Sequence, residues 1–280
     1  MNYHSTEWIL NKLGEHHLEA TTCVPETHIV GTFLQGSQNY GLDLKGSDVD
    51  TKCIVTPTFK DIALARKPLS TTHIRQNDEH IDLKDIRLYM QTFRKQNLNF
   101  LEILFTPYYI MGPNLVYTTQ WQRLVDRRED ITHYDPVRSV KSMMGIASEK
   151  YYAMEHEYPS RKMWLDQFGY DPKQLHHLLR VEEYLDRYLA GESYADCLVS
   201  KQPVYLQEIK IGYYTLDQAR DVANKAYSHI HEVCDNFVEK HKDDSVSKEI
   251  DELLDDVAYE IMKASVQRDL WDAKGVPSFD

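Results

Sequence analysis

The chain has 280 residues, 42% of them hydrophobic, which is enough for a sizeable core and for about two domains. Its formal net charge of −12, from 32 Lys and Arg against 44 Asp and Glu, argues against non-specific coating of nucleic acid or of an anionic membrane. No apolar run approaches the roughly 18 residues of a membrane span, and the start lacks the pattern of a secretory signal. We therefore expect a cytoplasmic protein without membrane contact.

The acidic charge is concentrated in the second part of the chain. Residues 1–120 carry 11 basic and 13 acidic groups, whereas residues 121–280 carry 21 and 31. We interpret the acidic end as a solvated helix face.

The cysteines and histidines do not form a metal-binding pattern. The four cysteines lie far apart without CxxC spacing, and the histidines include no HExxH. We therefore expect reduced, buried thiols and no zinc site. The cysteines are Cys23, Cys53, Cys197 and Cys234.

The first part of the chain alternates between helical and strand patterns. Residues 5–19 predict a helix with Ser5 or Thr6 as its cap. An amphipathic helix is predicted from Lys84 to Gln96, and residues 98–105 predict a further buried helix. Three apolar or β-branched runs predict strands, at residues 28–34, 51–55 and 80–83.

From Asn114 onward the pattern is almost wholly helical. Pro136 begins one helical run, and Asp171-Pro172 begins another, with proline at the first helical position. Two long amphipathic helices are predicted at residues 215–241 and 246–268. The simplest architecture is α+β, with an α/β domain over residues 1–112 and a helical domain over residues 113–280.

The segment GSQNYGLDLKGSDVD, from Gly36 to Asp50, is the most informative part of the sequence. Glycine at 36 lets the backbone approach a phosphate, and the Ser37 hydroxyl can hydrogen-bond to it. Asp48 and Asp50 alternate with Val49, so on a strand both carboxylates point the same way. Two adjacent carboxylates repel each other unless a cation lies between them, and Mg²⁺ suits carboxylates together with substrate phosphates.

A third carboxylate would allow two metal ions, which clamp the attacking and leaving oxygens of a phosphoryl transfer. Asp82 is the preferred candidate, because apolar residues flank it as on a neighbouring strand of the same sheet. Asp85 and Asp78 are the alternatives. The first falls at the start of a predicted helix and the second in a loop.

The Gly-Ser pair, the SDxD that follows and a later apolar-Asp-apolar strand resemble the polymerase-β-like nucleotidyltransferase superfamily. The stretches DEHIDLKDIRLYMQTFRKQNLNFLEILFT and FGYDPKQLHHLLR look like the predicted phage and bacterial RNA-ligase-associated nucleotidyltransferases. The resemblance implies a small mixed sheet with flanking helices, followed by an all-helical domain that completes the cleft. It implies that Gly36 and Ser37 hold phosphate. It also implies that Asp48, Asp50 and Asp82 are catalytic metal ligands.

Positive charge for a phosphate ligand is expected from the second part of the chain. Many members of the superfamily carry an arginine just after the Gly-Ser pair, where this chain has Gln and Asn at 38–39. Lys173, His177 and Arg180 lie at i, i+4 and i+7 of a predicted helix, so they share one face. The resembled family has a similar pattern here, and Lys210 matches another of its positions.

The expected function is metal-dependent transfer of a nucleoside monophosphate from an NTP to an acceptor hydroxyl, with release of pyrophosphate. Mg²⁺ is the expected ion, and Mn²⁺ could replace it. The resemblance favours an RNA end as acceptor, as in RNA repair, with a protein or a small molecule as the alternative. A nucleotide-binding regulatory module without turnover is the rival hypothesis, and three unused carboxylates argue against it, because their repulsion would cost stability.

Other polar and aromatic residues receive structural interpretations. Glu102, an acid in an apolar run, is expected to form a salt bridge with an arginine. His176 is expected to lie in the core or on the surface, and Tyr40 and Phe100 are expected to be packing residues.

Overall fold

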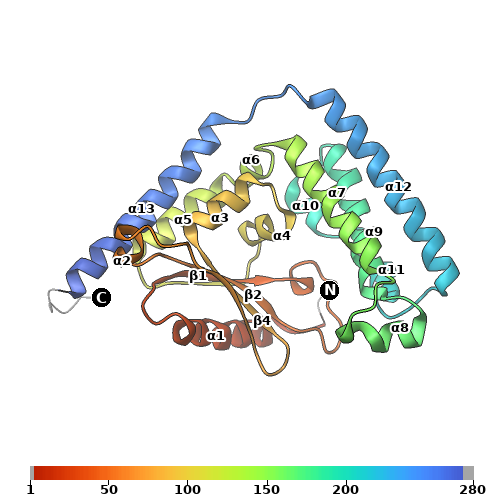
Figure 1. Ribbon diagram of the computed structural model, residues 1–280, viewed down its shortest axis with the longest axis horizontal. Helices are drawn as coiled ribbons and strands as arrows, with labels where there is room; N and C mark the ends of the chain where they lie inside the picture. The colour runs from red at the N-terminus through yellow and green to blue at the C-terminus, as the bar shows by residue number, and fades with distance from the viewer. Residues whose placement is uncertain (1–2, 274–280) are drawn as a thin grey trace.

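The structure is a computed structural model that describes residues 3–273 (Figure 1). Within these residues, a five-stranded sheet has the order β3-β4-β2-β1-β5. β2 and β4 are parallel, and the other neighbouring strands are antiparallel. The mixed sheet and its many helices have the α+β class that the sequence predicts. The strands are β1 (Ile29–Gln35), β2 (Asp50–Val55), β3 (Ser70–Ile74), β4 (His80–Asp85) and β5 (Tyr109–Met111).

The two edge strands are absent from the sequence-based prediction, whereas the three inner strands are confirmed. β3 is mostly exposed, so it has no buried face to produce an alternating pattern. β5 has only three residues and pairs with β1 at the opposite edge. Short edge strands with few buried residues carry little sequence signal, and this explains both omissions.

One face of the sheet is covered by α1 (Thr6–Cys23) (Figure 1). Ser5 caps this helix as predicted, because its hydroxyl accepts the Trp8 N–H at 3.2 Å. Alternate residues of β2 and β4 pack on this side, namely Cys53, Val55, Ile81 and Leu83. The intervening positions of both strands therefore face the opposite side, where the candidate site lies.

Five short or medium helices follow the sheet strands: α2 (Phe59–Ala63), α3 (Ile86–Arg94), α4 (Leu98–Leu101), α5 (Leu115–Asp126) and α6 (Arg128–Thr132). α3 begins later than predicted, because Lys84 and Asp85 complete β4 and the Asp85 side chain caps the helix. The predicted helix over residues 98–105 is α4 followed by a 3-10 turn at Glu102–Leu104.

The rest of the described chain is helical, as predicted. The helices are α7 (Pro136–Ala153), α8 (Lys162–Phe168), α9 (Pro172–Leu189), α10 (Tyr194–Leu198), α11 (Pro203–Lys210), α12 (Leu216–His241) and α13 (Lys248–Asp272). Both predicted proline starts are confirmed. Asp171 caps α9 by accepting the Lys173 N–H at 2.9 Å, which fixes where this helix begins.

α12 and α13 form two long arms, and the second returns to the sheet layer beside α5 and α3 (Figure 1). Acidic residues of α13 form ion pairs there. Arg94 lies 2.7 Å from Asp255, and Arg123 lies 2.7 Å from Asp256. Asp255 and Asp256 are 74% and 53% exposed, so the predicted solvated acidic face is present here, and arginines of α3 and α5 reach it at the surface.

Among the described residues, the largest hydrophobic cluster spans both the sheet and the helices that follow it. It includes Phe33 and Ile54 of the sheet, Leu178 of α9 and Leu254 of α13. Packing is thus continuous across residue 112, and the division into domains there stays a prediction. Among residues 3–273, no helix is both long and apolar enough to cross a membrane.

The cysteines are free thiols in this structure. Three of them are buried, as expected, and Cys23 is partly exposed. Burial raises the pKa of Cys53 to about 12, so this thiol is a packing group and not a nucleophile.

Docking of α13 can be tested through one buried side chain. Leu254 is fully buried, so Leu254→Ala should lower the free energy of unfolding by about 2–5 kcal/mol in urea denaturation. Leu270, on the same helix, is 45% exposed, and its change to alanine should cost less than about 0.5 kcal/mol. Equal effects of the two substitutions would contradict the docking.

Candidate active site

The turn after β1 contains a glycine whose backbone conformation disfavours any other residue. Gly36 has φ of +103°, a backbone conformation that a side chain strains. Ser37 follows at the start of a 3-10 turn, Ser37–Asn39. The Asn39 amide donates to the carbonyl of Leu34 at 2.9 Å, and the Thr106 hydroxyl donates to Asn39 at 2.6 Å. Asn39 therefore shapes the turn at a position where the resembled superfamily often has arginine.

The two aspartates of SDVD lie side by side near this turn. Asp50 is the first residue of β2. Asp48 was predicted to lie on the same strand, but it lies just before it. Val49, between them, is buried on the side of α1 against Ile9. Both aspartates line the same cavity. The Gln38 amide donates to the backbone carbonyl of Asp48 at 2.7 Å, which links the turn to the carboxylate pair.

Asp50 is the more constrained of the two carboxylates. Burial, followed by the negative charge of Asp48, raises the pKa of Asp50. One of its oxygens accepts the backbone N–H of His80 at 2.9 Å, and the His80 ring nitrogen Nδ1 lies 3.2 Å away. Repulsion between two neighbouring carboxylates is relieved by a bound cation.

Asp82 lies on the neighbouring strand, as predicted, but the structure does not bring it into the cavity. It is opposite Lys52 in the β2–β4 register, two positions along β2 from Asp50. The Lys52 ammonium lies 3.5 Å from its carboxylate, and the Thr72 hydroxyl lies 3.4 Å away. Asp82 therefore shares the sheet face of Asp50 but is held by a lysine.

The two alternatives to Asp82 also lie outside the residues that line the cavity. Asp85 caps α3 and forms an ion pair with Arg87 at 2.6 Å. Asp78 is an exposed turn residue with φ of +62°. Among the described residues 3–273, no three carboxylate, histidine or cysteine side chains gather as a metal cluster.

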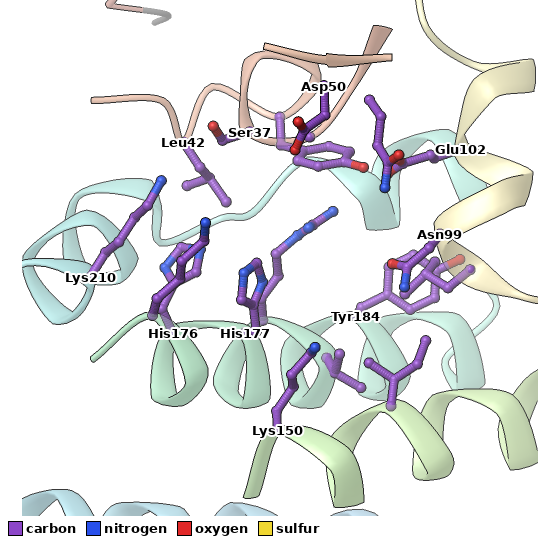
Figure 2. Close-up of a pocket in the computed structure, with 18 of the residues that line it drawn as sticks. Ser37, Leu42, Asp50, Asn99, Glu102, Lys150, His176, His177, Tyr184 and Lys210 are labelled. Atoms are coloured by element: carbon purple, nitrogen blue, oxygen red, sulfur yellow. The ribbon is translucent and has the colours of Figure 1, made fainter. Parts of the chain in front are cut away.

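The cavity, of about 230 Å³, lies between the Gly36 turn and the helices α9 and α11 (Figure 2). The predicted stripe on α9, Lys173, His177 and Arg180, lines it, and so does Lys210 at the end of α11. Eight of the nine predicted site residues therefore meet in one place, and Asp82 is the exception.

Three cations in this cavity are unpaired. Lys173, Arg180 and Lys210 make no ion pair or side-chain hydrogen bond with any residue in the described range 3–273. The Arg180 guanidinium lies 3.6 Å from the centre of the Tyr40 ring. By contrast Arg187, two turns later on α9, pairs with Glu192 at 2.8 Å. Cations that lie together without ion pairs repel one another unless an anion lies among them. The pKa of Lys210 is indeed lowered, by burial and then by the charges of Lys173 and Arg180.

The two adjacent histidines supply hydrogen bonds and not charge. Burial lowers the pKa of His176 to about 4 and holds that of His177 well below its usual range. Nδ1 of His176 donates to the carbonyl of Leu206 at 2.8 Å, so its Nε2 carries a lone pair. His176 is buried, one of the two positions expected for it, and it also lines the cavity. Because the pKa of His177 is low, the positive charge expected from this face of α9 comes from Lys173 and Arg180.

Within residues 3–273, Glu102 does not form the salt bridge with an arginine that was predicted for it. It forms no salt bridge within the described residues, although it is buried and lines the cavity. Burial raises its pKa to about 8, against the opposing effects of Arg180 and of the backbone N–H of Gly36. Glu102 and Asn99 were not predicted as site residues. Their spacing of three, as polar residues within an apolar run, is the signal that could have indicated them.

The donor set fits a divalent ion that arrives with phosphate. Asp48 and Asp50 offer carboxylate oxygens in the cavity, and Mg²⁺ is commonly held by one or two carboxylates plus substrate phosphates. The arrangement as described does not provide the three carboxylates of a two-ion site.

Comparison with known proteins adds one distant likeness. No family model matches the chain, and no curated protein matches it. Among solved structures, it is similar to a nucleotidyltransferase-like protein from Exiguobacterium sibiricum 255-15. The two share 12% identity over 94% of this chain and 91% of that one, with a TM-score of 0.33. A likeness of this degree carries no argument about activity, so the proposal below rests on the cavity.

The state of Glu102 predicts a pH dependence of stability. Its pKa of about 8 in the folded protein exceeds the ordinary value of 4.5, so the folded state binds more protons between these pH values. Stability should therefore fall as pH rises through this window, by at most about 1.4 kcal/mol per pH unit. Glu102→Gln should flatten that part of the profile and be the more stable protein at pH 8. Parallel urea-denaturation profiles for the two proteins would contradict a neutral Glu102.

Proposed function

We propose that this protein is a metal-dependent nucleotidyltransferase of the polymerase-β-like type. One observation carries the proposal. Lys173, Arg180 and Lys210, none of them ion-paired within residues 3–273, share a cavity with Asp48 and Asp50, in a protein of net charge −12. A cavity with free cations at one wall and paired carboxylates at the other suits a polyphosphate that carries a divalent ion.

Different residues of the cavity would contact different parts of a triphosphate. Gly36 and Ser37 offer a turn that a phosphate can approach closely, because glycine has no side chain there. The cations of α9 and α11 neutralise the β- and γ-phosphates. Asp48 and Asp50 hold Mg²⁺, or Mn²⁺ in its place, which when bound polarises the phosphoryl group.

The proposed reaction needs only the NTP and the acceptor as reactants. The acceptor hydroxyl oxygen forms a bond to the α-phosphorus, and the bond from that phosphorus to the bridging oxygen breaks. Pyrophosphate leaves, and the hydroxyl proton passes to a carboxylate. Asp82 remains the predicted acceptor of that proton, a role that requires its contact with Lys52 to give way. Catalysis would come mainly from positioning and electrostatics.

We favour an RNA end as the acceptor, on the sequence resemblance, and place the activity in RNA repair. A protein or small-molecule hydroxyl is the alternative within the same chemistry. A regulatory module that binds nucleotide without turnover is the rival, and it too would use the unpaired cations.

Incubation with each α-³²P-labelled NTP, Mg²⁺ or Mn²⁺ and a cell extract tests the proposal. Transfer of label to any acceptor supports it. Label removed by RNase indicates RNA, label removed by protease indicates protein, and label resistant to both indicates a small molecule. Binding of NTP with no labelled product in any lane would favour the regulatory module.

Asp48→Asn should abolish transfer while the fold is kept, because it removes one of two mutually repelling carboxylates. We expect a loss of at least about 100-fold, since a metal ligand contributes several kcal/mol to the transition state. Asp78→Asn, in the exposed turn before β4, is the matched control and should keep full activity. A residual rate above about one tenth of wild type would remove Asp48 from the proposed metal site.

Arg180→Met should weaken binding of Mg·NTP by about tenfold or more, because it removes a charge-assisted contact with phosphate. Thermal stability without nucleotide should fall only by the loss of the contact with the Tyr40 ring, since Arg180 has no ion pair to lose within residues 3–273. Arg187→Met is the contrasting variant on the same helix. It breaks the ion pair with Glu192 and should leave nucleotide affinity unchanged. Isothermal titration calorimetry measures both, and equal affinities for the two variants would argue against a phosphate site on α9.

A further inference from the structure

The cavity has two chemically different ends (Figure 2). Figure 2 shows Lys210 and His176 at one end, and Asn99, Glu102 and Tyr184 at the other. Lys173 lies near Lys210, since its charge helps to lower the Lys210 pKa after the effect of burial. A ligand that fits the whole cavity therefore has its most anionic part at the Lys210 end.

The end away from Lys210 contains buried polar groups that lack partners. The hydroxyl of Tyr184 is buried and has no hydrogen bond of ordinary geometry within residues 3–273, although the Tyr194 ring is close by. The hydroxyl of Tyr40, which also lines the cavity, is buried without a partner in the same range. Groups of this kind are costly unless a ligand or water satisfies them.

Two further groups complete the polar set. The Asn99 carboxamide makes no hydrogen bond with the described residues, whereas its backbone N–H donates to Asn97 at 3.0 Å. Glu102 keeps its proton at neutral pH, as argued above, so it can donate a hydrogen bond and does not repel a ligand. Together these side chains offer uncharged donors and acceptors.

The remaining surface at this end is apolar. Leu98, Ile146 and Val181 contribute aliphatic side chains to the lining. A flat heteroaromatic ring suits such a site, because its faces pack on aliphatic groups and its edge carries donors and acceptors.

Two cations remain close to this end. The charge of Arg180 acts on Glu102 while its guanidinium packs on the Tyr40 ring. Lys150 lines the cavity and pairs with Glu149 at 2.6 Å. Because the other polar groups at this end are uncharged, a neutral ring suits it better than a further phosphate.

We propose that this end, formed by Asn99, Glu102 and Tyr184 against Leu98 and Val181, binds the nucleobase of the NTP. The inference rests on the proposed function and deepens it. Asp50, which Figure 2 shows between the two ends, would then lie beside the α-phosphate, where transfer occurs. The hydroxyl of Tyr184 and the amide of Asn99 read the base edge, so these two side chains set base preference.

Calorimetric titration with inorganic tripolyphosphate and with each of the four NTPs, all with Mg²⁺, separates the two ends. Tripolyphosphate reports on the lysine end alone. We expect at least one NTP to bind about tenfold or more tightly than tripolyphosphate, as a base held by two or three hydrogen bonds requires. Asn99→Ala and Tyr184→Phe should each reduce that ratio by about threefold to tenfold and leave tripolyphosphate affinity unchanged.

Tyr89→Phe is the matched control for the loss of a buried hydroxyl. The Tyr89 hydroxyl is also buried without a partner in the described range, but Tyr89 does not line the cavity. It should leave the ratio unchanged, and melting temperatures of all three variants verify folding. Equal binding of tripolyphosphate and every NTP, or an unchanged ratio in both test variants, would overturn the base site and leave the phosphate site standing. Binding of neither ligand would overturn the proposed function itself.

Discussion

The contact between Arg180 and Tyr40 joins the two walls of the cavity, and the rest of the site depends on it. Tyr40 follows the Gly36–Ser37 turn, and Arg180 lies on α9 with its guanidinium 3.6 Å from the ring centre. A second tie reinforces it. Gln207 of α11 donates to the carbonyls of Gly41 and Asp43 at 3.4 and 3.3 Å. These contacts tie the Gly36–Ser37 turn to the helices α9 and α11.

The distribution of charge makes this arrangement possible in an acidic protein. Acidic residues near the C-terminal helix are neutralised by arginines of α3 and α5, as in the Arg94–Asp255 and Arg123–Asp256 pairs. Within residues 3–273, Lys173, Arg180 and Lys210 of the cavity lack such partners. Net charge therefore says little about the site, because a short stripe of cations without ion pairs determines the local potential.

Local sequence patterns predicted the elements whose signal is periodic. The proline and aspartate at 171–172 marked the start of α9, and the i, i+4, i+7 spacing placed Lys173, His177 and Arg180 on one face, which the structure confirms. Spacing could not predict protonation. His177 is neutral because it is buried beside other cations, and burial is a property of the packed fold.

The sequence by itself determined the α+β class, the Gly36–Ser37 turn, the carboxylate pair and the helix stripe, because each depends on neighbours within a few residues. Tertiary structure decided the fate of Asp82 and Glu102. The β2–β4 register sets Asp82 opposite Lys52, two positions from Asp50, and the register between two strands cannot be read from either strand alone. Glu102 lacks its expected salt bridge because Arg180 packs on the Tyr40 ring, a contact between residues 140 positions apart that only the folded chain brings together.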